Sequence, residues 1–232
     1  MQLTRDGLYK VVCMIRTPSN GLIGTGCFIE KNNHLYLITA EHVKNGIFQD
    51  SELVFGESNS ENHIILLNSL IKGNWYTHNI ADLAAIEFDQ NRLNSLFSER
   101  FLSYNQCLLN SNMISRDREL TVVGFPYGLG TCFSGSSKFC PLSFRSFASS
   151  SFMSMERADR RSLCDFFCLE NPAMGGYSGG PVFDLGYIKT PVMTQSYGET
   201  MLLGFIHGTM CDKTGGKLAL VTPSYYLNEL IP

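Results

Sequence analysis

One serine stands in a run of glycines that can present its hydroxyl group to a substrate. Ser178 lies in residues 175–181, Gly-Gly-Tyr-Ser-Gly-Gly-Pro. Glycine adopts backbone conformations that a Cβ forbids, so this run can form a tight turn that enters a strand. In such a turn the N–H groups of Gly176 and Ser178 can converge to form an oxyanion hole, which stabilises charge on a carbonyl oxygen. A plain Gly-rich hairpin is the alternative, but the length of the run favours a nucleophile.

The base that would activate this serine is predicted at His42. A serine hydroxyl is a weak nucleophile until a base removes its proton, and histidine has a pKa close to neutral pH. His42 lies two residues after a mainly apolar run, residues 36–40, and a strand end gives a side chain rigid support. Three other histidines lie among polar residues: His34, His63 and His78. A lone histidine is more often structural, but the serine motif favours a general base here.

An acid is needed to hold the other imidazole nitrogen, and Asp82 is the candidate. It opens residues 82–86, Asp-Leu-Ala-Ala-Ile, which are otherwise apolar. A carboxylate at the edge of a buried strand is costly unless it is paired, and this cost predicts a partner. Glu87 and Asp89 are weaker candidates because they stand where the strand ends. A surface acid that caps a turn is the alternative. Together the three side chains predict nucleophilic acyl transfer.

Short β-rich runs between glycines and prolines must position these side chains. The chain has 21 Gly and 8 Pro, and several runs either alternate in polarity or are wholly apolar, as half-buried and core strands do. Many short strands at close spacing predict an all-β sandwich or a pair of barrels. The expected strands cover residues 8–16, 26–30, 35–40, 64–70, 83–88, 120–125, 181–183, 201–207 and 218–221.

Other segments complete the expected organisation. Residues 91–103 predict a short helix or a linker, and a boundary near 95–118 divides the chain into two similar halves. The tail, 223–231, predicts a terminal helix with Pro223 near its start, where a missing N–H is harmless. The Ser/Phe-rich insertion at 134–162 predicts one strand followed by a long surface loop.

The order His, Asp, Ser and the residues around them resemble the trypsin/chymotrypsin superfamily of serine proteases. Residues 39–42, Thr-Ala-Glu-His, resemble its Thr-Ala-x-His motif, and 82–84 resemble its Asp-Leu-Ala strand. Residues 176–181 resemble the nucleophile loop of the family. Residues 124–128, Gly-Phe-Pro-Tyr-Gly, are similar to a turn of the bacterial HtrA-like branch. The resemblance covers about residues 8–231, and the motifs are specific in combination.

The resemblance implies two packed six-stranded antiparallel β-barrels, with the active site between them and a short C-terminal helix. Residues 1–105 would form the N-terminal barrel and carry His42 and Asp82. Residues 106–232 would form the C-terminal barrel and carry Ser178 and the specificity pocket. In the implied mechanism, Ser178 attacks the scissile carbonyl while His42 takes its proton and Asp82 orients the imidazole. This chemistry needs neither a cofactor nor a metal.

Two departures from the family concern activation and cysteine pairing. Tyr177 precedes the serine where secreted trypsins carry an aspartate that pairs with the new N-terminus, and no Ile-Val-Gly-Gly site precedes the first strand. We therefore do not expect activation by that route, which the bacterial and viral branches also lack. Val43 replaces the cysteine that follows the catalytic histidine in trypsins, so the usual nearby disulfide cannot form.

The specificity pocket is expected around Pro172, Phe205 and His207. Pro172 lies six residues before the serine, where trypsin has an aspartate, so a preference for Lys or Arg is not expected. Glutamyl endopeptidases and picornaviral 3C proteases have Gly-x-His in the strand of the pocket wall, and that histidine binds Glu or Gln side chains. His207 lies one residue later, and such a shift turns a strand side chain to the other face. Substrate contact, a strand-capping role and a pocket for small or apolar side chains all stay open.

Composition and charge narrow the classes of partner. The 232 residues carry a net charge of −3, and no run of Lys or Arg could neutralise a series of phosphates. Neither nucleic acid nor a membrane is therefore an expected partner. Arg157, Arg160 and Arg161 are interrupted by acidic residues and predict a solvated loop. The chain shows no secretory signal and no apolar run of the ~18 residues that span a bilayer, so we expect a cytoplasmic location, with secretion as the alternative.

The eight cysteines allow two interpretations. An even number could form four disulfides in a secreted protein. The missing signal and the valine at position 43 favour reduced thiols in a cytosolic compartment. Cys164 and Cys168 have no matching Cys/His pair nearby, so they do not predict a metal site.

These observations predict a serine endopeptidase that cleaves peptide or protein substrates, and two alternatives stay open. The fold could be a catalytically silent module that binds or scaffolds other proteins, with the insertion at 134–162 as its partner surface. The same insertion could hold an active enzyme latent until an activating protein binds.

Overall fold

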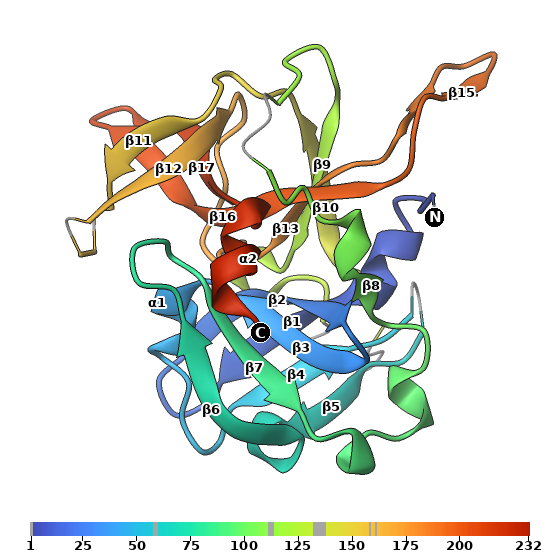
Figure 1. Ribbon diagram of the computed structural model, residues 1–232, viewed down its shortest axis with the longest axis vertical. Helices are drawn as coiled ribbons and strands as arrows, with labels where there is room; N and C mark the ends of the chain where they lie inside the picture. The colour runs from blue at the N-terminus through green and yellow to red at the C-terminus, as the bar shows by residue number, and fades with distance from the viewer. Residues whose placement is uncertain (1, 58–59, 111–113, 132–137, 158, 161) are drawn as a thin grey trace.

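Two β-sheets, one from each half of the chain, lie one above the other (Figure 1). The computed structural model describes residues 2–57, 60–110, 114–131, 138–157, 159–160 and 162–232. Within these residues the first sheet has eight strands and the second has seven, where six in each were expected. In the first sheet the two-residue strand β8 (Leu102–Ser103) pairs in parallel with β2, whereas every other strand pair is antiparallel.

The strand order of the first sheet is β5-β4-β1-β2-β3-β7-β6. Its strands are β1 (Val12–Thr17), β2 (Leu22–Lys31), β3 (His34–Thr39), β4 (Glu52–Phe55), β5 (His63–Leu66), β6 (Ile71–Thr77) and β7 (Ala84–Phe88). The strand order of the second sheet is β10-β9-β13-β16-β17-β12-β11. Its strands are β9 (Leu120–Gly124), β10 (Leu142–Ser146), β11 (Met153–Glu156), β12 (Leu163–Leu169), β13 (Pro181–Asp184), β16 (Met201–Asp212) and β17 (Gly215–Pro223).

A hairpin and short helices complete the described fold. Strands β14 (Tyr187–Lys189) and β15 (Thr194–Ser196) pair only with each other and project from the second sheet (Figure 1). The α-helices are α1 (Glu41–Lys44) and α2 (Leu227–Leu230). The 3₁₀ helices are η1 (Gly7–Val11), η2 (Leu67–Ser69), η3 (Gln90–Arg92), η4 (Ser95–Phe97), η5 (Tyr104–Gln106), η6 (Pro126–Gly128) and η7 (Ser224–Tyr226).

The β2–β3 hairpin sets the register that leads to His42. Asn32 and Asn33 form its turn with φ angles of 52° and 65°, and asparagine tolerates this left-handed region better than most residues. β3 then pairs with β7 so that Thr39 lies opposite Ala84. This pairing brings the end of β3 beside the residues that precede β7.

An aromatic cluster fills the core of the first sheet and gives these strands firm support. The Phe28 ring packs edge-on against Phe55 at 6.1 Å and against Phe97 at 6.0 Å, and Phe88 lies 5.9 Å from Phe97. Each of these side chains is buried, and burying one such side chain contributes about 1.5–3 kcal/mol. The second sheet has its own smaller core, which includes Tyr177 and Val182 beside the predicted nucleophile.

The insertion at 134–162 contains two strands rather than the one that was expected. Its residues 134–137, 158 and 161 lie outside the described part. β10 pairs with β9 at one edge of the second sheet, and β11 pairs with β12 at the other. Both strands contain serine and a charged residue and are only partly buried, so their apolar alternation is weak in the sequence.

The tail forms the expected terminal helix as two joined turns, η7 and α2. Figure 1 shows it running from the second sheet to the first. The ammonium group of Lys31 on β2 donates to the carbonyl of Ile231 at 2.7 Å, which ties the tail to the first sheet. Among the described helices, none is both long and apolar enough to cross a bilayer.

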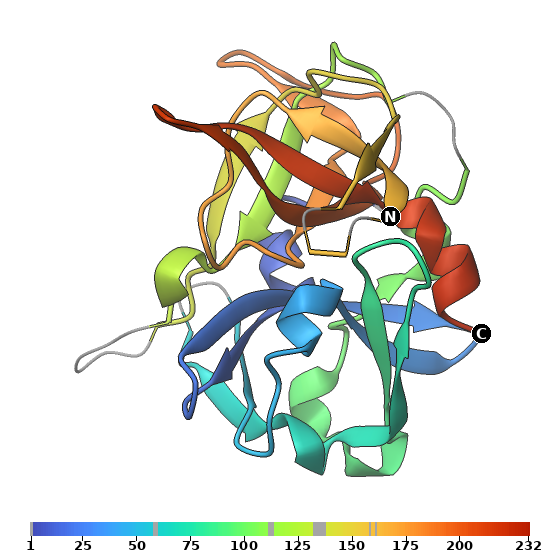
Figure 2. The ribbon, with the colours of Figure 1, turned by 90° about the vertical axis from the view of Figure 1, so that its left-hand side faces the viewer.

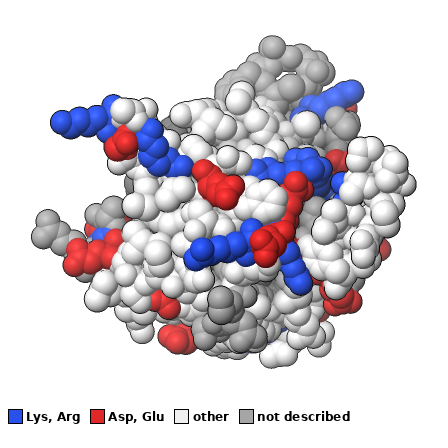
Figure 3. All heavy atoms as spheres, turned by 90° about the horizontal axis from the view of Figure 1, so that it is seen from above, with Lys and Arg blue, Asp and Glu red and all other residues white. Residues whose placement is uncertain are grey.

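Charged side chains of both signs lie close together on one face of the molecule, and most of the described cysteines are buried. Figure 3 shows Lys and Arg side chains next to Asp and Glu on the face seen from above, with wide uncharged areas between them. The seven described cysteines are free thiols, and five of them are buried: Cys13, Cys27, Cys107, Cys164 and Cys168. Cys132 lies outside the described residues.

Candidate active site

The loop that carries Ser178 is locked to the first sheet through Thr25 on β2. The N–H of Thr25 donates to the carbonyl of Ser178 at 2.9 Å, and its hydroxyl donates to the carbonyl of Gly176 at 2.7 Å. Gly179 has a φ of +78°, and a Cβ there would lie 2.3 Å from the Thr25 carbonyl oxygen. Only glycine fits this close approach.

The backbone around Gly176 leaves two N–H groups available as an anion site. Gly176 has a φ of +100°, and the preceding carbonyl, of Gly175, accepts from the N–H of Tyr127 at 2.8 Å. In a trans peptide the N–H of Gly176 points away from that carbonyl. Among the described residues, neither the N–H of Gly176 nor that of Ser178 has a hydrogen-bond acceptor. Two N–H groups in one tight turn could bind an oxyanion, and the oxyanion hole itself stays a prediction.

Helix α1 begins directly after β3 and carries His42 to the acid. Nδ1 of His42 lies 2.7 Å from Oδ2 of Asp82, and the backbone N–H of His42 donates to Oδ1 at 3.0 Å. Asp82 is fully buried, two residues before β7. The two hydrogen bonds fix the ring and the carboxylate relative to each other. The structure therefore brings together His42 and Asp82 as the sequence predicted.

The electrostatics of this pair follow from burial and hydrogen bonding. Burial alone would raise the pKa of Asp82, but hydrogen bonds from His207 and His42 outweigh it and hold that pKa well below its usual range. Burial alone would lower the pKa of His42. The hydrogen bond to Asp82 and the charges of Asp82 and Asp159 outweigh burial and raise it. Asp82 is therefore ionised at neutral pH and accepts a hydrogen bond from the Nδ1–H group of His42.

The hydroxyl of Ser178 points to a different partner from the one predicted. It donates to the backbone carbonyl of His207 at 3.5 Å, and no hydrogen bond joins it to His42 among the described contacts. The centres of the His42 and His207 rings lie 5.8 Å apart. The imidazole of His42 and the hydroxyl of Ser178 are therefore both neighbours of His207. In proteases without substrate, catalytic hydrogen bonds are often long or poorly aligned.

His207 joins the acid rather than a substrate pocket. Its Nδ1 lies 2.6 Å from Oδ2 of Asp82, and its ring packs 5.0 Å from the ring of Phe166. The pairing of β16 with β17 shifts between Ile206 and Gly208, so His207 is the extra residue of a β-bulge. A bulge re-aims a side chain, which explains why strand alternation alone did not place this one.

A pocket of about 460 Å³ opens beside Ser178. Pro172 lines it as expected, but Phe205 is fully buried in the core and His207 is not part of the lining. None of the described lining residues carries a charge. They are Tyr127, Pro172, Ala173, Met174, Gly175, Ser178, Ile206, Gly208, Thr209, Cys211 and Gly216.

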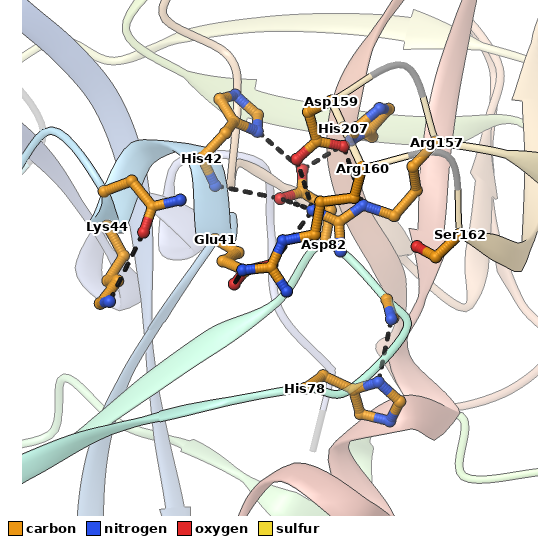
Figure 4. A network of polar contacts seen from close by, with 12 residues as sticks. Glu41, His42, Lys44, His78, Asp82, Arg157, Asp159, Arg160, Ser162 and His207 are labelled. Atoms are coloured by element: carbon orange, nitrogen blue, oxygen red, sulfur yellow. Dashed lines mark hydrogen bonds and ion pairs between the residues drawn. The ribbon is translucent and has the colours of Figure 1, made fainter.

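The structure adds a charged cluster that the sequence did not reveal (Figure 4). Arg157 was expected on a solvated loop, yet its side chain is 0% exposed. Its Nη2 lies 3.1 Å from Oε2 of Glu41 and 3.3 Å from Oδ1 of Asp82, and its Nε donates to Asp159 at 2.9 Å. Arg160 also contacts Glu41. Asp159 is the one acidic partner of Arg157 that lies close to it in the sequence, whereas Glu41 and Asp82 lie far away along the chain.

The loop that carries Arg157 bridges the two sheets. Nη1 of Arg157 and the hydroxyl of Ser162 both donate to the carbonyl of Ile80, at 3.1 and 3.2 Å. Figure 2 shows this loop, between β11 and β12, reaching towards α1 and the connection between β6 and β7. The loop thus closes the site on the side of the acid.

The donor atoms of His42, Asp82 and His207 lie within 4.8 Å of one another, a spacing that a metal ion could bridge. The guanidinium of Arg157 already places a fixed positive charge against Asp82. Both imidazoles also use their Nδ1 atoms in short hydrogen bonds to the carboxylate. This arrangement favours a hydrogen-bonded site over a metal site, and the absence of a metal stays a prediction.

Comparison with models of protein families gave no match, and comparison with curated proteins gave none. Solved structures do match. The inactive form of the Rv3671c protease is 15% identical with a TM-score of 0.61, covering 97% of this chain and 88% of the other. The active form from M. tuberculosis is 15% identical with a TM-score of 0.55, covering 97% and 80%.

The HtrA-type protease AlgW, solved with a tripeptide, is 17% identical with a TM-score of 0.56. The match covers 95% of this chain but only 58% of that one. At these identities the matches show the fold alone. The chain has the trypsin-like serine protease fold, and the fold class predicted from the sequence is confirmed.

Proposed function

We propose that this chain is a serine endopeptidase in which Ser178 is the nucleophile, His42 the general base and Asp82 the acid that orients the imidazole. The hydrogen bond between His42 and Asp82 carries the proposal, because it holds the imidazole in the tautomer with a free Nε2. The two free N–H groups beside Ser178 support it, since they can stabilise the oxyanion of an acyl-transfer reaction.

The proposed reaction has two halves. Oγ of Ser178 forms a bond to the scissile carbonyl carbon while its proton passes to Nε2 of His42. The tetrahedral adduct collapses, the C–N bond breaks, and the leaving amine takes the proton from His42. Water then attacks the acyl-enzyme ester, its proton passes to His42, and Ser178 regains a proton as the acid product leaves. The N–H groups of Gly176 and Ser178 bind the oxyanion in both halves.

The surrounding charges favour the imidazolium that this reaction forms. Three carboxylates and two guanidinium groups contact one another around His42, so with both imidazoles neutral the cluster has one net negative charge. Protonation of His42 neutralises it. This charge balance stabilises the state that develops as Ser178 attacks.

The hydroxyl orientation of Ser178 favours a second candidate, a latent form of the same enzyme. The hydroxyl now donates to His207, so it must turn towards His42 before the proton can move. Binding of substrate is one event that would turn it, and binding of an activating protein is another. A catalytically silent protein-binding module is the third candidate and requires that the hydroxyl never turns.

A fluorophosphonate probe separates these candidates, because it labels only an activated serine. We expect the purified wild-type protein to be labelled, and Ser178→Ala and His42→Ala to lose labelling while staying folded by circular dichroism. Labelling that appears only after a candidate activating protein is added would establish latency. A folded wild type that resists the probe under all conditions would overturn the endopeptidase and favour the silent module.

A further inference from the structure

His207 contacts the predicted acid and the predicted nucleophile at the same time. Its Nδ1 lies 2.6 Å from Oδ2 of Asp82, and its backbone carbonyl accepts the hydroxyl of Ser178 at 3.5 Å. Its ring also lies 5.8 Å from the ring of His42, at an angle of 89°. A single residue therefore connects the members of the site that come from different sheets.

The position of His207 is fixed by its surroundings. The β-bulge between Ile206 and Gly208 aims its side chain at the acid, and the ring of Phe166 supports it at 5.0 Å. The side chain is only 10% exposed. A ring held by a bulge, an aromatic neighbour and a hydrogen bond has little freedom to turn away.

We propose that His207 is a positioning residue of this site, which holds Asp82 through its ring and the resting hydroxyl of Ser178 through its carbonyl. The expected change in kcat rests on the proposed function. The expected change in the pKa of His42 does not need the protein to be an active enzyme. His207 would not touch the substrate side chain, because it is not among the described residues that line the pocket.

The hydrogen-bond capacity of Asp82 explains why a second imidazole matters. A carboxylate has about four acceptor positions. Oδ2 accepts from His42 and His207, and Oδ1 accepts from the backbone N–H of His42 and from Arg157. The side chain of Asp82 is fully buried, so a position left empty is not readily filled by water. Removing the His207 donor therefore leaves the carboxylate freer to turn.

The same removal changes the basicity of His42. Among the described residues, those that contact His207 are Asp82, His42, Phe166 and Ser178. The described charged groups that act on His42 are Asp82, Asp159 and Arg157. Without the imidazole of His207, Oδ2 of Asp82 accepts a hydrogen bond from His42 only, and its negative charge acts more strongly on His42. His42 then holds its proton more strongly, so its free-base form appears only at higher pH.

The kinetic test compares His207→Leu and His207→Ala, which lack a donor, with His207→Asn, whose amide can still donate to Asp82. For the two donor-free variants we expect kcat/KM to fall by up to about 100-fold, since misplacing a catalytic group by about 1 Å costs that much. The loss should appear in kcat, with KM little changed, and the acid limb of the pH profile should move to higher pH. His207→Asn should recover most of the loss.

Controls separate positioning from general damage. Thermal unfolding checks that each variant is folded, and two donor-free variants are used in case one fails to fold. His34→Leu is the matched control, because His34 is 53% exposed, pairs with Glu87, and begins β3 whereas His42 follows the end of that strand. Wild-type kcat/KM and an unmoved acid limb in a folded donor-free variant would overturn the proposal. So would an Asn variant no better than Leu.

An NMR titration of His42 in Ser178→Ala tests the same proposal without any activity. Adding His207→Leu should raise the pKa of His42, whereas adding His207→Asn should move it little. A shift in this background, together with a wild-type protein that the fluorophosphonate probe does not label, would uphold the positioning role while the endopeptidase falls. An unchanged titration would overturn the positioning role whatever the activity.

Discussion

The guanidinium of Arg157 lies 3.3 Å from Oδ1 of Asp82, although the two residues are 75 positions apart in the sequence. The same guanidinium contacts Glu41, the residue directly before the proposed base. The loop after β11 therefore supplies a buried positive charge to the acid half of the site.

Replacing Arg157 should destabilise the fold more than replacing its exposed neighbour. Arg157→Met leaves Asp82 and Glu41 buried without their guanidinium, and removing one partner of a buried ion pair costs about 3–5 kcal/mol. Arg160→Met is the matched control, because Arg160 pairs with the same buried Glu41 but its own guanidinium is 45% exposed, so solvent screening reduces what its loss costs. Urea denaturation measures both changes. Equal losses in the two variants would show that the buried contact has no special weight.

The pH dependence of kcat/KM should report His42. Because its pKa is raised above the ordinary ~6.5, activity should fall as the pH drops through a value above 6.5. Asp82→Asn removes the hydrogen-bonded charge that raises this pKa, so the acid limb should move to lower pH. The same change should lower kcat by about 10⁴-fold, as loss of the orienting acid does in serine proteases. An acid limb at the same pH in both proteins would contradict the assignment.

The same pKa shifts predict opposite effects on stability. Protonated His42 stabilises the fold below about pH 6.5, and this contribution is lost as the pH rises through the raised folded-state pKa. Ionised Asp82 stabilises the fold above about pH 3.9, and this contribution is lost as the pH falls through its lowered folded-state pKa. In Asp82→Asn, denaturation curves measured from pH 3 to 8 should lose both dependences. A pH dependence unchanged from wild type would contradict this account.

The uncharged pocket beside Ser178 predicts cleavage after uncharged side chains. A Lys, Arg or Glu side chain would enter it without a charged partner, and burying an unpaired charge is strongly unfavourable. Peptides with Leu or Met before the scissile bond should be cleaved at least about 100-fold better than those with Lys or Glu. Profiling with a peptide library measures this preference. A preference for Lys or Glu would contradict it.

Gly208 offers a way to narrow that pocket. A Cβ at Gly208 would have no atom within 4 Å, so a side chain there would extend freely into the opening. Gly208→Val should lower kcat/KM for Leu and Met substrates by more than tenfold while leaving Ala substrates nearly unchanged. Gly198→Val is the matched control, since Gly198 is also open and does not line the pocket. Equal loss for all three substrates would show that Gly208 acts through the fold instead.

Two adjacent glycines should differ sharply in their tolerance of alanine. A Cβ at Gly176 would lie 2.3 Å from the carbonyl oxygen of Phe125, at a φ of +100°. A Cβ at Gly175 would meet only the Tyr127 ring at 3.7 Å. Gly176→Ala should cost about 1–3 kcal/mol of stability and slow fluorophosphonate labelling at least tenfold, whereas Gly175→Ala should do neither. Similar labelling rates in the two variants would argue against the proposed oxyanion hole.

The sequence predicted those parts of the fold and site that depend on local patterns. Residues 35–40 and 83–88 predict strands because most of their side chains are apolar, and the glycines around Ser178 predict a tight turn. These local patterns put His42 and Asp82 at strand ends, and the structure brings the two together.

The remaining features depend on contacts that no local pattern encodes. His207 faces Asp82 because of a bulge, which shifts the alternation by one residue. Arg157 is buried because Glu41, 116 positions away, meets it across the two sheets. β11 was missed because its residues, Met-Ser-Met-Glu, remain largely exposed and lack an apolar face.

Thr25 is hydrogen-bonded both to the strand that leads to His42 and to the loop that carries Ser178. Its carbonyl accepts the hydroxyl of Thr39, three residues before His42, at 2.8 Å. Its N–H and hydroxyl hold the carbonyls of Ser178 and Gly176. One strand residue therefore ties the segment that leads to His42 and the loop that carries Ser178 to the same backbone position. A change at Thr25 would loosen both segments at once, whereas a change at His207 or Arg157 reaches the site only through Asp82 or Glu41.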